Sequence, residues 1–284
     1  MEKFTVLVID LKKSRSYSIE DRNSIQNYII AVIQKLNETF MNTILREVEF
    51  SAGDEVQGLF SSPEAAYLYL RLFNMLVSPV ELRAGIGVGE WSIKIENAST
   101  TAQDGPVYHN ARYAIENVKD SVGYSVLLFS GKENDIFINS AINTPFILTS
   151  NHSEYQNEIM LLTELLYPIN SHNVIDGRKM HHLSELVKLK NKLNYYTYFK
   201  MRKSVKKYPF DDIKHIIIDP YQIDAINDDN TFYVNSGKKR GMTMHLSDAL
   251  GISRQSIEKT YKTAKVYEAR NSTLVALKLM DKYL

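Results

Sequence analysis

The chain has 284 residues, more than one hydrophobic core usually serves, and its 44% hydrophobic and 24% charged residues are ordinary for a globular protein. It has no cysteine, so disulfides, thiolate metal sites and cysteine nucleophiles are excluded. The first residues do not read as a signal peptide, and no apolar stretch approaches the ~20 residues that a membrane helix needs. We therefore expect a cytoplasmic protein of two or more domains, without membrane contact.

The net charge of +1 hides an uneven distribution along the chain. Residues 1–150 contain 13 Lys and Arg against 18 Asp and Glu, a balance of −5. Residues 151–284 contain 21 against 15, a balance of +6. A basic region is a natural partner of nucleic acid, so this split predicts DNA binding by the second half. Lysine-rich helices are also common as solvated surface, and that alternative stays open.

The first 130 residues alternate strand and helix patterns. The predicted strands cover residues 4–9, 44–50, 56–60, 82–95 and 124–129, and the predicted helices cover 19–40, 63–75 and 105–118. Ser62 is the expected N-cap of the second helix, with Pro63 at its first position. The order β-α-β-β-α-β-α-β predicts an α+β, ferredoxin-like fold, with helices on one face of a largely antiparallel sheet.

Residues 130–157 are rich in Asn and Ser and are predicted to form a polar loop, with a domain boundary near residue 150. The expected domains are therefore 1–150 and 151–284, the second all-α. His182-Leu183-Ser184-Glu185 recurs as His245-Leu246-Ser247-Asp248. This echo indicates two tandem units, 159–210 and 211–284, although four similar residues can also match by chance.

Two acidic residues stand beside predicted strands. Asp10 ends the apolar run Val6 to Ile9, and Asp54 follows Gly53 at a turn between the second and third strands. If those strands are neighbours, both carboxylates meet at one sheet edge, where they can hold Mg²⁺ against phosphates. Glu55 is a candidate third metal ligand or a simple edge charge. The alternative is a strand cap and an ordinary hairpin turn.

Residues 246–262 carry the pattern of a helix-turn-helix. Leu246 and Leu250 lie one helical turn apart, Gly251 can turn the chain, and Ser253 can cap a second helix. The side chains expected on the outer face of that second helix are Arg254, Gln255, Glu258, Lys259 and Lys262. Such a helix can enter the major groove of DNA. A plain helical hairpin with a glycine cap would show the same turn.

The matching stretch after residue 182 lacks the glycine, because Lys188 stands where Gly251 does. Its lysines Lys188, Lys190 and Lys192 are expected to contact DNA phosphates and not to read bases.

Several motifs resemble one family along nearly the whole chain. The matching pieces are Asp10 with Ser14-Arg15, Asp21-Arg22, residues 53–60, residues 82–90, residues 104–112 and the Leu250-Gly251-Ile252-Ser253 turn. On these motifs the chain is identified as a member of the SatD family. The resemblance names a relative and not an activity.

More distantly, the first half resembles the class III nucleotidyl cyclase domain, which has the palm-type fold of many polymerases. This resemblance implies that Asp10 and Asp54 bind Mg²⁺ and that Arg112 stabilises charge on the phosphates during transfer. The chain departs from adenine-reading cyclases at two positions, with Phe50 in place of a lysine and Tyr108 in place of an asparagine. The resemblance therefore implies a site that binds metal and phosphates, without the cyclase contacts at the positions of Phe50 and Tyr108.

Three further basic residues, Arg15, Arg22 and His109, are candidate phosphate ligands. The arginines could instead pair with Glu20 and Asp21, and a lone histidine on a helix more often packs or caps.

The leading hypothesis is a DNA-binding regulator whose first domain binds a nucleotide or phosphorylated ligand through Mg²⁺. The alternative is an enzyme of nucleotide chemistry, namely a cyclase, an oligonucleotide synthase or a triphosphatase, with Asp10, Asp54 and Arg112 as its catalytic residues. A third possibility is a palm domain that serves only as a dimerisation scaffold. Because cyclase-like domains commonly pair, we expect a homodimer.

Overall fold

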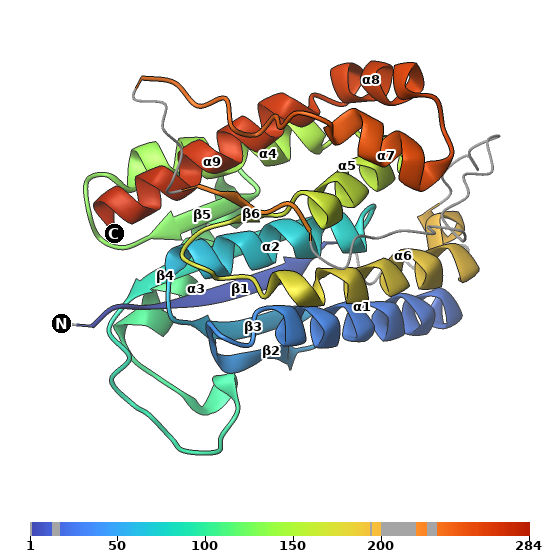
Figure 1. Ribbon diagram of the computed structural model, residues 1–284. Coiled ribbons are helices and arrows are strands. Elements are labelled where there is room, and N and C mark those ends of the chain that lie inside the picture. The colour runs from blue at the N-terminus through green and yellow to red at the C-terminus, as the bar shows by residue number, and fades with distance from the viewer. Residues whose placement is uncertain (1, 13–17, 194, 200–219, 226–231) are drawn as a thin grey trace.

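The computed structural model describes residues 2–12, 18–193, 195–199, 220–225 and 232–284 (Figure 1). Its main sheet contains β1 (Phe4–Leu11), β2 (Ile44–Ala52), β3 (Glu55–Phe60), β4 (Leu82–Gly89) and β5 (Val126–Phe129). The helices of the first half are α1 (Ile19–Thr39), α2 (Pro63–Val77) and α3 (Pro106–Asp120). They are followed by α4 (Asp135–Thr149), α5 (Glu154–Leu166), α6 (Leu183–Lys192), α7 (Met242–Leu250), α8 (Arg254–Thr263) and α9 (Val266–Tyr283).

The strands of the main sheet follow the order β2-β3-β1-β4-β5. The central strand β1 pairs antiparallel with β3 and with β4, whereas β5 joins the edge of β4 in parallel. The first four strands with α1 and α2 therefore form a ferredoxin-like unit. The predicted α+β class, element order and largely antiparallel sheet are confirmed, and Ser62 caps α2 as expected by accepting a hydrogen bond from the backbone of Ala65.

Helices cover both faces of the sheet, so the prediction that they lie on one face is wrong. Leu7 and Ile9 of β1 share a core with α1 and α2, whereas Val6 and Val8 pack on the other face against α3 (Figure 1). Successive side chains of a strand point to opposite faces. A strand that is apolar at every position must therefore be covered on both sides, which the unbroken run Val6 to Ile9 already implied.

Two glycines of β4 let α3 approach the sheet closely. A Cβ atom at Gly87 would lie 2.2 Å from the backbone nitrogen of Ala111, and one at Gly85 would lie 2.5 Å from that of Ile115. Any side chain at either position would push α3 away from the sheet. The alternating glycines thus serve helix packing, and the helix α3 is what positions Arg112.

Residues 130–157, predicted to be a polar loop, contain α4 and the start of α5 instead. Ile138, Ile142 and Phe146 recur at four-residue spacing and are buried, which is the pattern of an amphipathic helix. Ser153 begins α5 with a capping box that it shares with Gln156. The prediction of a loop was wrong because the segment is mostly polar and its helix buries only a narrow apolar stripe.

The asparagines of α4 explain that composition. The Asn143 side chain accepts a hydrogen bond from the backbone N–H of Val126 and donates one to its carbonyl. Asn139 makes the same two bonds to Leu128. Both strand residues belong to β5, at the edge of the sheet. The amides of α4 therefore satisfy backbone groups that an open edge would leave unpaired.

The helices after residue 150 pack directly on the first half of the chain. α5 contacts α2, α6 contacts α1, and α9 contacts α4 and α2 (Figure 1). One continuous hydrophobic core includes side chains from Leu7 to Met280. The second half is mostly helical, as predicted, but it is not all-α, since β6 (Ile169–Asn170) pairs in parallel with β7 (Ile223–Asp224).

The repeated tetrapeptide does not occupy equivalent positions in the two proposed units. His182 directly precedes the first residue of α6, whereas His245 lies within α7. Much of the stretch between those helices lies outside the described residues, so the division into tandem units stays a prediction.

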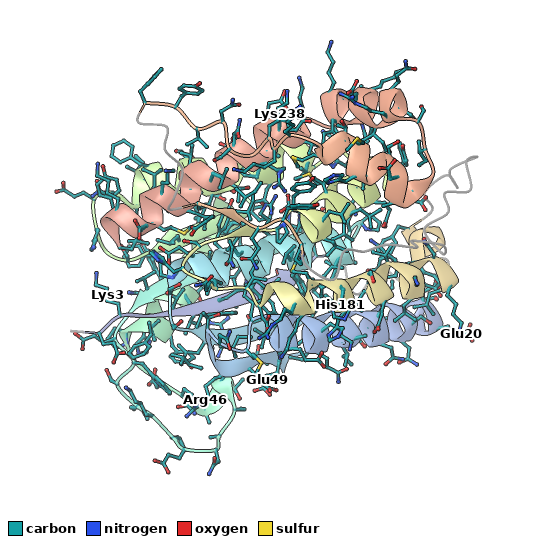
Figure 2. The ribbon with its side chains drawn as sticks, viewed as in Figure 1. Lys3, Glu20, Arg46, Glu49, His181 and Lys238 are labelled. Carbon is teal, nitrogen blue, oxygen red and sulfur yellow. The ribbon has the colours of Figure 1, made fainter. Side chains whose placement is uncertain are left out.

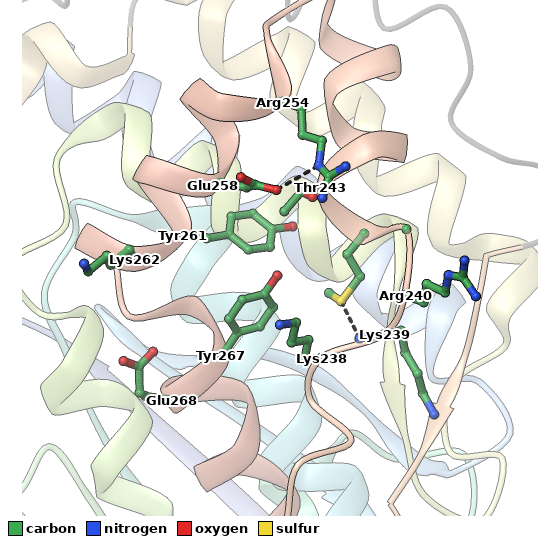
Figure 3. A pocket seen from close by; sticks show the side chains of 12 residues that line it. Lys238, Lys239, Arg240, Thr243, Arg254, Glu258, Tyr261, Lys262, Tyr267 and Glu268 are labelled. Atoms are coloured by element: carbon green, nitrogen blue, oxygen red, sulfur yellow. Dashed lines mark hydrogen bonds and ion pairs between the residues drawn. The ribbon is translucent and has the colours of Figure 1, made fainter.

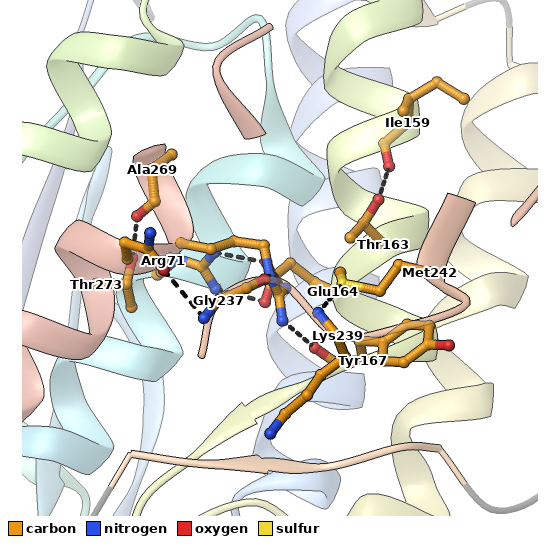
Figure 4. Close-up of polar contacts among 12 residues, drawn as sticks. Arg71, Ile159, Thr163, Glu164, Tyr167, Gly237, Lys239, Met242, Ala269 and Thr273 are labelled. Carbon is orange, nitrogen blue, oxygen red and sulfur yellow. Dashed lines mark hydrogen bonds and ion pairs between the residues drawn. The ribbon is translucent and has the colours of Figure 1, made fainter. Parts of the chain in front are cut away.

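A buried ionic network joins three helices (Figure 4). The Glu164 carboxylate on α5 accepts two hydrogen bonds from Arg71 of α2, at 2.7 and 2.6 Å, and a further one from Arg270 of α9. All three side chains are at most 3% exposed. Burial alone would raise the pKa of Glu164, but the charges and hydrogen bonds of Arg270 and Arg71 outweigh it and hold that pKa below its usual value.

Lys190 was predicted to contact DNA, and the structure contradicts this. Its side chain is fully buried on the inner face of α6, with its Nζ 3.7 Å from Oε1 of the buried Glu158 on α5. Burial lowers the pKa of Lys190 to about 8, against the opposing attraction of Glu158. Charge content alone could not reveal this, because helical position decides which lysine faces inward.

Glu164→Gln is expected to destabilise the protein by about 3–5 kcal/mol, because it leaves two buried guanidiniums without a carboxylate. The matched control is Glu268→Gln, which removes an exposed carboxylate from α9. The control should cost less than about 1 kcal/mol. Urea unfolding monitored by circular dichroism gives both free energies. Equal losses in the two variants would contradict a structural role for the network.

The stability of the protein is expected to rise with pH between about 8, the folded pKa of Lys190, and 10.5, its ordinary value. In this window the unfolded chain binds the proton that the folded protein has released, so deprotonation favours folding. The slope should reach at most about 1.4 kcal/mol per pH unit.

The double variant Lys190→Met/Glu158→Gln removes both groups and should flatten this rise. Lys192→Met, which alters an exposed lysine of the same helix, should keep it. Urea unfolding at a series of pH values compares the three proteins. A double variant with the same pH profile as the original protein would refute the assignment.

Candidate functional site

The backbones of Asp10 and Asp54 lie at one edge of the sheet, because β1 and β3 are neighbours as the sequence predicted; that their carboxylates meet there stays a prediction. β1 and β3 are neighbours, with Asp10 in register with Glu55. The backbone N–H of Leu11 donates a hydrogen bond to the Asp54 carbonyl at 3.1 Å, which ties the end of β1 to the hairpin turn. Gly53 permits this turn by adopting a positive φ of 63°. The pairing of β1 with β3 and the turn at Gly53 therefore determine the backbone positions of Asp10 and Asp54.

Arg112 of α3 contacts this edge through Glu55. Its two terminal nitrogens donate hydrogen bonds to the two Glu55 carboxylate oxygens at 2.7 and 2.9 Å. Ser51 donates a further bond to Glu55 at 2.9 Å. Burial alone would raise the pKa of Glu55, but the bonds from Arg112 and Ser51 outweigh it and lower that pKa. The Arg112 side chain is still 45% exposed, so an incoming anion can reach it.

A second arginine, which the sequence analysis did not single out, lies beside Asp10. Arg83 of β4 is in register with Asp10, and its Nε lies 3.9 Å from the Asp10 carboxylate. That Nε is buried and has no hydrogen-bond partner. Asp10, Glu55, Arg83 and Arg112 thus form a sheet-edge cluster of two carboxylates and two guanidiniums. Only the pairing of β1 with β4 could have identified Arg83.

The predicted metal site of Asp10, Asp54 and Glu55 does not form as a group of three. No set of three His, Cys, Asp or Glu side chains in the described part of the chain is arranged to hold a metal ion. Glu55 instead uses both oxygens to bind Arg112. Asp10 and Asp54 remain the side chains whose oxygen donors suit Mg²⁺.

Of the other predicted phosphate ligands, His109 and Arg22 do not join the cluster. His109 is 74% exposed and lies 3.3 Å from Asp104, which also accepts a hydrogen bond from the backbone of Gly105 at the start of α3. Arg22 lies in the first turn of α1, and no carboxylate pairs with it among the residues described. Arg15 lies outside the described residues.

The helix-turn-helix predicted at residues 246–262 is present as α7, a left-handed glycine and α8. Gly251 has a φ of 62°, and Ser253 caps α8 by accepting a hydrogen bond from the backbone of Ser256. Ile257 and Tyr261 are buried on the inner face of α8. The side chains on its outer face are exposed as predicted, namely Arg254, Gln255, Glu258, Lys259 and Lys262.

The two groups of residues predicted to bind DNA lie on separate surfaces. Lys188 and Lys192 are exposed on α6, which packs against α1 and α5. α8 packs against α5, α7 and α9 instead (Figure 1). Of these two groups, only the α8 residues lie on the second helix of the helix-turn-helix.

None of the helices in the described ranges is long and apolar enough to cross a membrane. A comparison with curated proteins finds no match. Among solved structures, the chain is similar to a bacterial light-regulated adenylyl cyclase, with a TM-score of 0.33 and 12% sequence identity over 44% of this chain and 74% of the other. The strand order, and not this likeness, defines the fold.

The family comparison covers most of the chain. The model of the SatD family matches residues 4–206, which include the whole main sheet and the sheet-edge cluster. The chain therefore belongs to the SatD family.

Proposed function

We propose that this protein is a DNA-binding regulator that contacts DNA through α8. The observation that carries the proposal is the outer face of α8, where Arg254, Gln255, Lys259 and Lys262 are exposed beside a glycine turn. Cationic side chains on such a helix can neutralise phosphates, and Arg and Gln can read base edges. The balance of +6 in the second half of the chain agrees with an anionic partner.

The position of α8 is fixed by its buried contacts. The Tyr261 hydroxyl forms a 2.7 Å hydrogen bond with Thr163 of α5. α5 in turn is held to α2 by the bonds between Glu164 and Arg71. These contacts connect α8 to the ferredoxin-like unit. Such a connection would let a ligand of that unit influence DNA binding by α8.

Replacing Lys259 and Lys262 by alanine is expected to weaken binding to DNA fragments of any sequence. Each lysine that contacts a phosphate should contribute about one unit to the slope of log K against log salt concentration. Fluorescence anisotropy with labelled fragments at several salt concentrations measures the slope. Lys282→Ala, at the far end of α9, is the control and should change nothing. The proposal would be contradicted if the protein does not bind DNA at low salt, or if replacing both lysines leaves the slope unchanged.

A second function is favoured by the sheet-edge cluster, namely binding or processing of a nucleotide. Asp10 and Asp54 would hold Mg²⁺, which would neutralise charge on bound phosphates. Arg112 is exposed enough to transfer its hydrogen bonds from Glu55 to a phosphate. Arg83 would orient the Asp10 carboxylate from the neighbouring strand. The cluster thus supports a phosphate ligand, whether or not that ligand is then turned over.

Asp10→Asn is expected to reduce Mg²⁺-dependent nucleotide binding at least tenfold, because it removes a charged metal ligand without changing the size of the side chain. Calorimetric titration with each nucleoside triphosphate, with and without Mg²⁺ or Mn²⁺, measures binding, and chromatography of the products detects turnover. Glu20→Gln, an exposed carboxylate of α1, is the control (Figure 2). If Asp10→Asn retains full turnover or Mg²⁺-dependent binding, the cluster is not the nucleotide site. The hypothesis that then remains for the palm domain is a dimerisation scaffold.

A further inference from the structure

A pocket of 410 Å³ lies between α8, the start of α7 and the start of α9 (Figure 3). Its walls come from residues 238–243, from α8 and from the first turn of α9. This volume is typical of small-molecule sites. Lys238, which belongs to the pocket, lies on the opposite side of the molecule from Arg46 and Glu49 of β2 (Figure 2). None of the residues that line the pocket belongs to the sheet-edge cluster, so the two are separate, and we call this one the α8 pocket.

The α8 pocket carries an excess of positive charge. Its cationic side chains are Lys238, Lys239, Arg240, Arg254 and Lys262, against the carboxylates Glu258 and Glu268. Arg254 pairs with Glu258 at 2.8 Å, and Glu268 pairs with Lys265 at 3.8 Å. The other four cations form no ion pair with a carboxylate in the part of the chain that the structure describes. Converging positive charges that outnumber the carboxylates around them favour the binding of an anion.

The basic segment of the pocket is held in place at its base. The Gly237 N–H donates a 3.0 Å hydrogen bond to the Asn271 side chain, and the Gly237 carbonyl accepts a 2.9 Å bond from the buried Arg270. The Lys239 N–H contacts the Met242 sulfur at 3.0 Å. A Cβ atom at Gly237 would lie 2.5 Å from the Asn271 oxygen, so any other residue would force Asn271 to move. A binding segment that is already ordered loses little entropy when its ligand arrives.

Tyr267 supplies an aromatic wall, and the buried Tyr261 packs behind it. The rings of Tyr261 and Tyr267 meet edge to face, with their centroids 5.2 Å apart. The Lys238 ammonium lies 5.4 Å from the centroid of Tyr267. In Figure 3, Lys238, Arg254 and both rings point toward one another, while Lys262 lies at the opposite end of the pocket from Arg240. Cations beside an aromatic surface suit a molecule that combines phosphates with a flat ring.

We propose that the α8 pocket binds a phosphorylated small molecule of the nucleotide class, and that this ligand competes with DNA for Arg254 and Lys262. Both side chains line the pocket and also belong to the outer face of α8. A ligand that engages them leaves fewer cations for DNA phosphates. The competition rests on the proposed DNA-binding function, whereas the binding of the ligand does not.

Calorimetric titration of the full chain with ATP, pyrophosphate and adenosine tests the binding. EDTA is present throughout, so that Mg²⁺-dependent binding at the sheet-edge cluster does not contribute. ATP is expected to bind most tightly, pyrophosphate more weakly, and adenosine at least tenfold more weakly than ATP, because it lacks the charged groups that the cations recognise. Equal affinity for adenosine and ATP would overturn the assignment to phosphates.

Variants then locate the ligand. Lys238→Ala and Tyr267→Leu should each weaken ATP binding at least tenfold, and Lys238→Arg should restore most of it. Lys282→Ala, at the far end of α9 and outside the pocket, should leave it unchanged. Thermal unfolding confirms that each variant is folded. Loss of ATP binding in Arg112→Ala but not in Lys238→Ala would place the ligand at the sheet edge and overturn the proposal.

The final measurement repeats the DNA titration with and without saturating ATP. ATP should weaken DNA binding several-fold in the original protein and not in Lys238→Ala. ATP binding with unchanged DNA affinity would overturn the competition alone. If neither ATP nor pyrophosphate binds while Lys238→Ala weakens DNA binding, the pocket serves the DNA backbone and the proposal is wrong. If the protein binds ATP but no DNA, the proposed function fails and the pocket assignment stands.

Discussion

The Glu164 carboxylate is the point on which the arrangement of the two halves of the molecule depends. It belongs to α5 and binds Arg71 of α2 and Arg270 of α9, all three side chains being excluded from water. Leaving one of these buried charges without its partner costs far more free energy than burying the complete network. The packing of α2, α5 and α9 therefore depends on all three side chains. Arg270 also binds the Gly237 carbonyl, at the base of the basic segment of the α8 pocket. One carboxylate therefore joins α2, α5 and α9 and, through Arg270, the base of the α8 pocket.

The sheet-edge cluster uses the same kinds of group with a different degree of exposure. Glu55 and Arg112 form two short hydrogen bonds, yet Arg112 is 45% exposed. The Asp10 and Arg83 side chains are about a quarter exposed and 3.9 Å apart. Water can solvate such partly exposed groups when a partner leaves. Exchanging a carboxylate for a phosphate therefore costs little free energy at the sheet-edge cluster, whereas the same exchange at the buried Glu164 would cost a great deal. Exposure thus separates ion pairs that maintain the fold from ion pairs that a ligand can replace.

Much of the fold followed from local patterns, and the errors have specific causes. The strand and helix order of residues 4–129, the Gly53 turn and the Gly251 turn were correctly predicted, because each depends on residues close in sequence. The prediction misses helix α4 because asparagine is typical of loops, whereas Asn139 and Asn143 bind the edge of β5. Arg83 was missed because only strand pairing places it beside Asp10.

The sequence by itself determined the alternation of strands and helices, the two aspartates beside strand ends and the glycine turn before α8, since periodicity and turn chemistry are local properties. Tertiary structure alone decided which charges are buried, which are paired and which remain available. Lys190 and Lys192 are two residues apart on one helix, yet one faces Glu158 in the core and the other faces water. Likewise, the α8 pocket combines residues 238–243 with α8 and α9, and only packing brings these separate segments around one space.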